Sequence, residues 1–104
     1  MAHSLILCTA SSEEEASRIA RHLVEKRLAA CVSISANHRS VYRWEGELCE
    51  TQEWQLLIKA KSTRYLEIEG EIRALHSYDV PEIIALPVES GLLDYLQWID
   101  SATI

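Results

Sequence analysis

The sequence has little of what a linker, a secreted mini-protein or a membrane span requires. Only three Gly and two Pro occur among its 104 residues, which excludes a low-complexity linker and limits the number of tight turns. Its three cysteines are an odd, widely spaced set without any Cys-x-x-Cys pair, so a disulfide scaffold and a locally assembled zinc or redox site are both excluded. The longest apolar runs, at residues 4–10 and 83–88, fall far short of the roughly 20 residues of a membrane-spanning helix.

Basic residues are also in the minority. Ten Lys and Arg stand against 16 Asp and Glu, for a formal net charge of −6. This balance argues against a binder of nucleic-acid backbones, because Lys and Arg are needed to replace the counterions of the phosphates. The chain does not begin with a basic segment followed by an apolar one, the pattern of a secretion signal. We therefore expect one cytoplasmic domain, residues 1–104, that contacts neither nucleic acid nor a membrane.

The spacing of apolar residues predicts an alternation of strands and helices. An apolar run at residues 4–9 predicts a buried strand. A Ser-x-x-Glu capping box at residues 11–15, followed by apolar residues at helical spacing, predicts a helix whose buried face runs from Ala16 to Val24. The remaining elements are expected as a second strand that opens at residues 28–34 and resumes at 40–44, a third strand at 54–60, a helix at 65–75, a strand at 81–86 and a helix at 92–99. This order is that of an α+β, ferredoxin-like βαββαβ fold with an antiparallel sheet and a short C-terminal helix.

The second and third strands are expected to form an unusually long hairpin with its tip near Gly46. Each arm far exceeds the ~5–6 residues of an average strand. Two helices of ordinary length leave the outer part of such a hairpin uncovered, and this part carries Tyr42, Trp44 and Trp54. We therefore predict a homo-oligomer in which the hairpin edge pairs with a neighbouring chain and buries these aromatics. An arm that folds back on its own subunit is the alternative.

The connectivity brings three distant residues to one edge of the domain. In a right-handed split βαβ arrangement, the end of the first strand, the end of the second helix and the start of the last strand lie together. We therefore expect Cys8, His76 and Glu82 to be neighbours. A thiolate and an imidazole suit copper or zinc, although structural zinc takes four ligands. The alternative is that Cys8 is a small buried residue and that His76 caps the second helix.

The other cysteines and histidines have no companions at ligand spacing. Cys31 stands in an apolar Ala-Ala-Cys-Val run and is expected in the core, whereas Cys49, beyond the hairpin tip, is expected to be exposed. We expect the remaining histidines at the surface: His3, His22 and His38. No Gly-rich phosphate loop, Gly-x-Ser-x-Gly elbow or His-Glu-x-x-His motif occurs, so we predict no enzymatic activity.

Five segments resemble the CutA divalent-cation tolerance family, in the same order and over nearly the whole chain: residues 7–10, 23–32, 42–46, 75–84 and 95–99. The resemblance implies a cytoplasmic homotrimer of ferredoxin-like subunits, related in architecture to the nitrogen-regulatory PII proteins and linked to copper and divalent-metal tolerance.

The resemblance also implies a copper site. Family members bind copper through a cysteine at the Cys8 position and a histidine pair, of which this chain retains His76 and has Leu75 in place of the other. We therefore expect weak copper binding through Cys8 and His76, with Glu82 as a further ligand and zinc as another possible ion. The alternative function is that of a PII-like small-molecule sensor or scaffold, with metal binding incidental. A polar cluster of Tyr78, Asp79 and Glu82 would serve either function.

Overall fold

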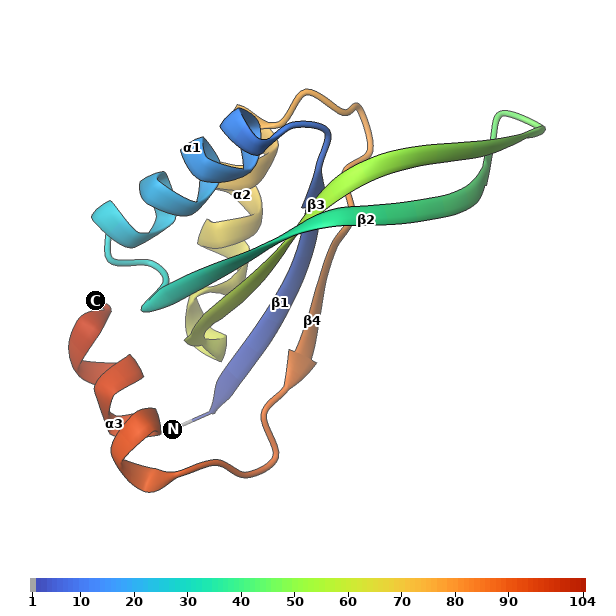
Figure 1. Cartoon of the computed structure of the whole chain (residues 1–104). Coiled ribbons are helices and arrows are strands. Elements are labelled where there is room, and N and C mark those ends of the chain that lie inside the picture. The colour runs from blue at the N-terminus through green and yellow to red at the C-terminus, as the bar shows by residue number, and fades with distance from the viewer. Residues whose placement is uncertain (1) are drawn as a thin grey trace.

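The computed structural model describes residues 2–104 (Figure 1). Four strands, three α-helices and one short 3-10 helix follow one another in the order β1 (His3–Ala10), α1 (Glu13–Glu25), β2 (Cys31–Trp44), β3 (Glu47–Lys61), η1 (Ser62–Arg64), α2 (Tyr65–Leu75), β4 (Ile83–Pro87) and α3 (Leu93–Ala102). The strands form one sheet in the order β2-β3-β1-β4, and every neighbouring pair is antiparallel. The predicted α+β, ferredoxin-like βαββαβ fold is therefore confirmed, including its terminal helix.

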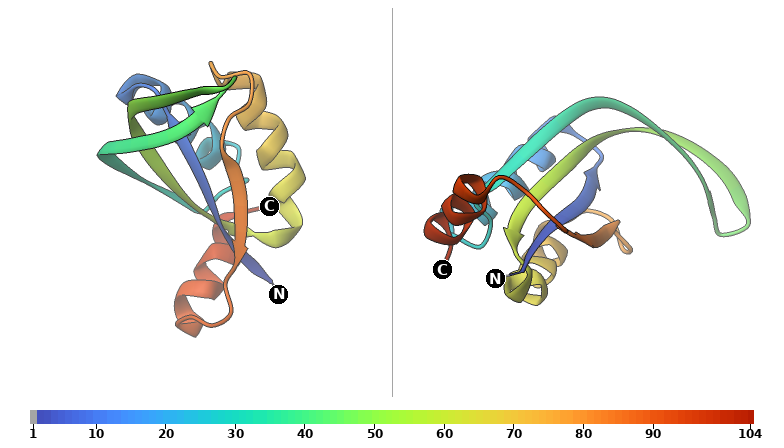
Figure 2. Two further views of the ribbon diagram at one scale, coloured as in Figure 1. Left: turned by 90° about the vertical axis from the view of Figure 1, so that its right-hand side faces the viewer. Right: turned by 90° about the horizontal axis from the view of Figure 1, so that it is seen from below.

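The core lies between the sheet and the pair of helices α1 and α2 (Figures 1 and 2). Alternate residues of a strand point to opposite faces, so Ile6 and Cys8 of β1 face the helices and are fully buried. The helices contribute apolar residues at three- and four-residue spacing, which line one side of each: Ile19 and Leu23 from α1, and Ile68 and Ile72 from α2.

The start of α1 is fixed by the predicted capping box. The Ser12 hydroxyl accepts a hydrogen bond from the Glu15 amide at 3.1 Å, and a Glu15 carboxylate oxygen accepts one from the Ser11 amide at 3.2 Å. At the other end of the helix the predicted face is too wide. Val24, the residue before the end of the helix at Glu25, is 40% exposed, whereas Ala20 and Leu23 are buried.

The β2–β3 hairpin extends well beyond the rest of the sheet and curves as it does so (Figures 1 and 2). A β-bulge between Ser35 and His38 interrupts its register, and such a bulge bends a strand. Tyr42 and Trp44 are 39% and 46% exposed, as predicted for a monomer. Trp54 was wrongly placed among the uncovered aromatics. It lies opposite Ala10 in the register and packs against the core of its own subunit.

Two further predictions of burial were wrong. Cys31 is only half-buried and lies outside the core, because it begins the edge strand β2. His3 is buried rather than exposed, since β1 starts at this residue and the imidazole bonds Asp100 of α3 at 2.8 Å. His22 and His38 are half-buried, and so is Cys49.

The second face of the sheet carries a row of apolar side chains. Leu7 lies opposite Leu57 of β3 on one side and opposite Ile84 of β4 on the other. Two residues before Leu7 on β1, Leu5 lies opposite Leu86 of β4. Ile84 and Leu86 are 52% and 44% exposed. The row therefore continues to an edge strand without being covered by α1 or α2, which pack on the opposite face. None of the helices formed by residues 2–104 is long and apolar enough to cross a bilayer.

Candidate functional site

The predicted meeting of β1, α2 and β4 is confirmed. His76, the residue after α2, donates from Nε2 to the carbonyl oxygen of Thr9 at 2.7 Å. Cys8 lies opposite Ile83 in the sheet, so Glu82 is one residue away from its strand partner. Connectivity alone was enough to place these residues together. Their side chains, however, belong to different surroundings: Cys8 faces the helices, whereas Glu82 lines a cavity on the other side.

Both ring nitrogens of His76 already have partners. Besides the bond from Nε2 to Thr9, Nδ1 accepts a hydrogen bond from the Tyr78 amide at 3.1 Å. These partners assign the neutral tautomer with its hydrogen on Nε2. The ring thereby connects the end of α2 to the end of β1. A metal ion at either nitrogen would have to displace one of these hydrogen bonds.

The thiol of Cys8 is held in its protonated form. Burial raises the pKa of Cys8 to about 12, and the nearby carboxylates of Glu82, Glu15 and Glu53 act in the same direction. The residue is 0% exposed, and its Sγ donates only a long contact of 3.6 Å to the Thr9 carbonyl. Because a metal binds the thiolate, an ion at this position would have to displace a proton from a dry environment.

A buried carboxylate stabilises the same corner. Glu15 is 4% exposed and accepts hydrogen bonds from the Ser11 amide and hydroxyl at 3.2 Å each, and from the Ser77 amide at 2.7 Å. Burial alone would raise the pKa of Glu15, but these hydrogen bonds outweigh it and lower the pKa below its ordinary value. The carboxylate thus connects the start of α1 to the turn after α2 through three hydrogen bonds.

The donors at this corner do not form a ready-made metal site. Nowhere in residues 2–104 do three or more His, Cys, Asp or Glu residues converge as metal ligands would. Cys8 and His76 supply only two donors, one a protonated thiol and the other an imidazole with both nitrogens engaged. Copper or zinc therefore fits these residues poorly in the arrangement described here.

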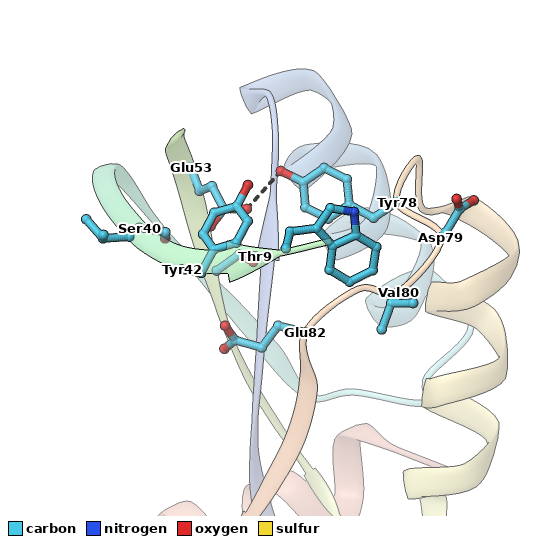
Figure 3. Close-up of a pocket in the computed structure, with 10 residues that line it drawn as sticks. Thr9, Ser40, Tyr42, Glu53, Tyr78, Asp79, Val80 and Glu82 are labelled. Atoms are coloured by element: carbon cyan, nitrogen blue, oxygen red, sulfur yellow. Dashed lines mark hydrogen bonds between the residues drawn. The ribbon is translucent and has the colours of Figure 1, made fainter. Parts of the chain in front are cut away.

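A cavity of about 580 Å³ lies beside this corner, beneath the curved hairpin (Figure 3). Neither Cys8 nor His76 is among its lining residues. These come from the end of β1, the hairpin and the turn before β4: Thr9, Ser40, Val41, Tyr42, Trp44, Glu53, Tyr78, Asp79, Val80 and Glu82. The polar cluster expected at this edge, Tyr78, Asp79 and Glu82, is therefore found in its wall.

The hairpin residues of the cavity were not expected as site residues. Glu53 is 6% exposed and accepts a hydrogen bond from the Tyr78 hydroxyl at 2.8 Å, and Figure 3 shows this bond spanning the cavity wall. Burial, together with the Glu53 carboxylate, raises the pKa of Tyr78 above its ordinary value of 10.0. Glu53 has no distinct signal in the sequence, because it occupies a polar position of the alternating strand pattern, as an exposed Glu would.

Known proteins resemble this chain over almost its whole length. The family model for the CutA1 divalent ion tolerance protein matches residues 4–102. The divalent-cation tolerance protein CutA of Thermus thermophilus is 46% identical over 99 residues, which is 95% of this chain and 96% of that protein. The corresponding protein of Archaeoglobus fulgidus is 45% identical over 98 residues, covering 94% of this chain and 95% of that protein.

Solved structures agree with the sequences. The Thermus thermophilus CutA1 structure has a TM-score of 0.95 at 46% identity and covers 97% of this chain and 98% of its own. CutA1 from Oryza sativa has a TM-score of 0.97 at 36% identity, covering 100% of this chain and 95% of its own. With the fold, the long hairpin and the sequence all in agreement, the chain belongs to the CutA family of divalent-cation tolerance proteins.

Proposed function

We propose that this chain acts as a non-enzymatic homotrimer in the cellular response to divalent cations, copper in particular. The observation that carries the proposal is the uncovered apolar row of the sheet, which runs through Leu7, Leu57 and Ile84 to an edge strand. An apolar row of this kind, next to a free strand edge, is stabilised when copies of the same chain cover it. The trimer is the assembly that the family resemblance implies.

The hairpin supports the same assembly. It projects from the subunit and carries Trp44, Tyr42 and the 72% exposed Leu48. Aromatic and large aliphatic side chains are enriched at subunit contacts. We infer that the hairpin of each subunit lies against a neighbour, so that the apolar surface left bare in one chain becomes internal to the trimer.

Copper binding through Cys8 and His76 is proposed as weak. Binding there requires loss of a thiol proton and of one imidazole hydrogen bond, and both lower the affinity. Glu82 is the additional donor proposed, because its charge already acts on the Cys8 thiol. A cytoplasmic location is part of the proposal, although the Archaeoglobus fulgidus relative is named as a periplasmic protein.

Copper titration of the purified protein tests the metal proposal. We expect weak binding by the native chain and weaker binding by Cys8→Ser and by His76→Ala. Cys49→Ser is the matched control, because Cys49 lies on the hairpin, far along the chain from this corner, and bonds only the Glu47 carbonyl. Equal affinity in all four proteins would end the assignment of these two ligands.

A second function is favoured by a different observation, the cavity beneath the hairpin. Its volume of about 580 Å³ lies in the range of small-molecule sites, and its wall excludes Cys8 and His76. On this proposal the chain is a small-molecule sensor or scaffold in the manner of the PII proteins, and metal binding is incidental. Ligand binding that is unaffected by Cys8→Ser and His76→Ala would separate it from the first.

A further inference from the structure

The cavity beneath the hairpin has an unusual chemical character. Three carboxylates belong to its wall, on Glu53, Asp79 and Glu82, together with three aromatic rings, on Tyr42, Trp44 and Tyr78. No Lys, Arg or His is among the residues that line it. Carboxylates around a concave surface raise the local concentration of cations, and the faces of aromatic rings attract them further.

The bulge in β2 determines this composition. The odd-numbered residues of β3, among them Glu53, share one face of the sheet. Their partners on β2 are odd-numbered before the bulge, including Ser33 and Ser35. After the bulge these partners are even-numbered, from His38 to Trp44. A shift of one residue exchanges the two faces of a strand. The bulge therefore turns Tyr42 and Trp44 toward the cavity. Without it, the odd-numbered residues of this arm, two of them arginines, would face inward.

The arginines of the hairpin are kept away from the cavity. Arg39 forms an ion pair with Glu50, and Arg43 donates to the carbonyl oxygen of Gly46 at 3.5 Å. Neither residue lines the cavity. Its carboxylates are thus left without an internal cation, which is a state that a cationic ligand would stabilise.

The buried carboxylate is held ready for such a ligand. Glu53 is 6% exposed, and the Tyr78 hydroxyl at 2.8 Å is the one hydrogen-bond donor that the structure gives it. A carboxylate accepts through two oxygens, and no side-chain oxygen within residues 2–104 is both fully buried and unpaired. The second oxygen of Glu53 is therefore not fully buried, and the residue lines the cavity.

A metal ion is a poor occupant of this space. The carboxylates do not converge, since no group of three potential ligands is found within residues 2–104. A volume of about 580 Å³ also far exceeds that of a bare ion. An anion would meet three carboxylates and no basic side chain, which is repulsive.

We propose that this cavity binds a small organic cation with more than one ammonium group, of the polyamine class. Glu53 binds one ammonium, Glu82 binds another, and the rings of Tyr42 and Trp44 contact the aliphatic chain between them. The inference rests on the second function proposed above and names its ligand class. It requires no copper at Cys8, and in the trimer proposed above the cavity would lie where the hairpin meets a neighbouring subunit.

Calorimetric titration of the intact protein with spermidine tests the proposal. We expect saturable binding of spermidine, no binding of the neutral triethylene glycol and none of the anion glutarate. Copper and magnesium ions are titrated separately as competitors. Displacement of spermidine by either ion at equal or lower concentration would overturn the proposal in favour of a metal site.

Three variants locate the binding. Glu82→Gln removes one exposed carboxylate of the wall, and we expect about tenfold weaker spermidine binding from the loss of a charged hydrogen bond. Trp44→Leu removes an aromatic wall, for which we expect about fivefold weaker binding. Glu25→Gln is the control, with the same change of charge at the exposed C-terminal end of α1, outside the cavity.

The outcomes are distinguishable from those of the copper experiment. If Glu82→Gln and Glu25→Gln weaken spermidine equally, the polyamine binds only the net negative charge and the proposal is wrong. If no ligand binds at all while copper still does, the sensor function fails and the metal function stands. If another small molecule binds with the same dependence on Glu82 and Trp44, the sensor function stands and the polyamine assignment fails.

Discussion

Replacement of Ile84 by Asp is expected to dissociate the assembly. Ile84 lies on β4, an edge strand, and is 52% exposed on the apolar row opposite Leu7. Its side chain is thus available to a neighbouring subunit without being part of the core beneath α1 and α2. The substitution changes the contact surface while the fold of the subunit is retained.

The magnitude follows from the exposed fraction. Full burial of an Ile side chain contributes about 1.5–3 kcal/mol, so covering the exposed half of Ile84 contributes about 1 kcal/mol per subunit. An Asp in the same place must be neutralised or desolvated, at a cost of several kcal/mol. Together these terms exceed about 3 kcal/mol per subunit, which raises each dissociation constant by more than about 100-fold.

Light scattering during size-exclusion chromatography measures the effect, and circular dichroism checks the fold. We expect the mass of Ile84→Asp at micromolar concentration to fall from that of a trimer to that of a single chain. Leu66→Asp is the matched control, because Leu66 is 77% exposed on α2, the helix that covers the opposite face. An unchanged mass for Ile84→Asp, or an equal loss in Leu66→Asp, would refute the role assigned to the apolar row.

Three further results are expected from the corner around Cys8. Glu15→Ala leaves the donors of Ser11 and Ser77 without their acceptor, so we expect a loss of about 3 kcal/mol in urea unfolding; an unchanged midpoint would show that these bonds contribute nothing. The pKa of Glu15 is lowered in the folded state, so the ionised carboxylate stabilises the fold fully above pH 4.5, and this stabilisation is lost as the pH falls through the folded pKa. In thermal melts at a series of pH values, Glu15→Gln should lack this part of the destabilisation by acid. With a pKa of about 12, the Cys8 thiol is ionised in about one molecule in 10,000 at pH 8, so iodoacetamide should label Cys49 first, and rapid labelling of Cys8 would contradict its burial.

Local patterns were sufficient to predict the elements of the fold. The capping box before α1 and the helical spacing behind it depend only on neighbouring residues, and the regular alternation of β3 depends only on its own sequence. The meeting of Cys8 with His76 also followed from connectivity, because the split βαβ arrangement has few alternatives. Predictions of this kind required no knowledge of side-chain packing.

The errors arose where register or a distant element decides burial. Trp54 is an aromatic on a projecting hairpin, yet its place opposite Ala10 turns it toward the helices. His3 is buried because α3, about 100 positions along the chain, brings Asp100 to it. Neither relation is visible in the nearby sequence.

The cavity could not be predicted for a similar reason. Its lining depends on the bulge between Ser35 and His38, which selects the face of the hairpin that carries Tyr42 and Trp44. The segment at this bulge has no Gly, and Asn37 adopts the left-handed conformation there with φ of 60°. Asn is one of few residues that tolerate this conformation, but the same residue is also typical of ordinary turns.

Native mass spectrometry of the purified protein, with and without copper, tests most directly the central claim that the functional unit is an assembly of this chain. The account predicts a species of three times the 11.8 kDa mass of one chain, present in both samples, with copper adducts that are lost at low excess. A single-chain mass in both samples at micromolar concentration would contradict it.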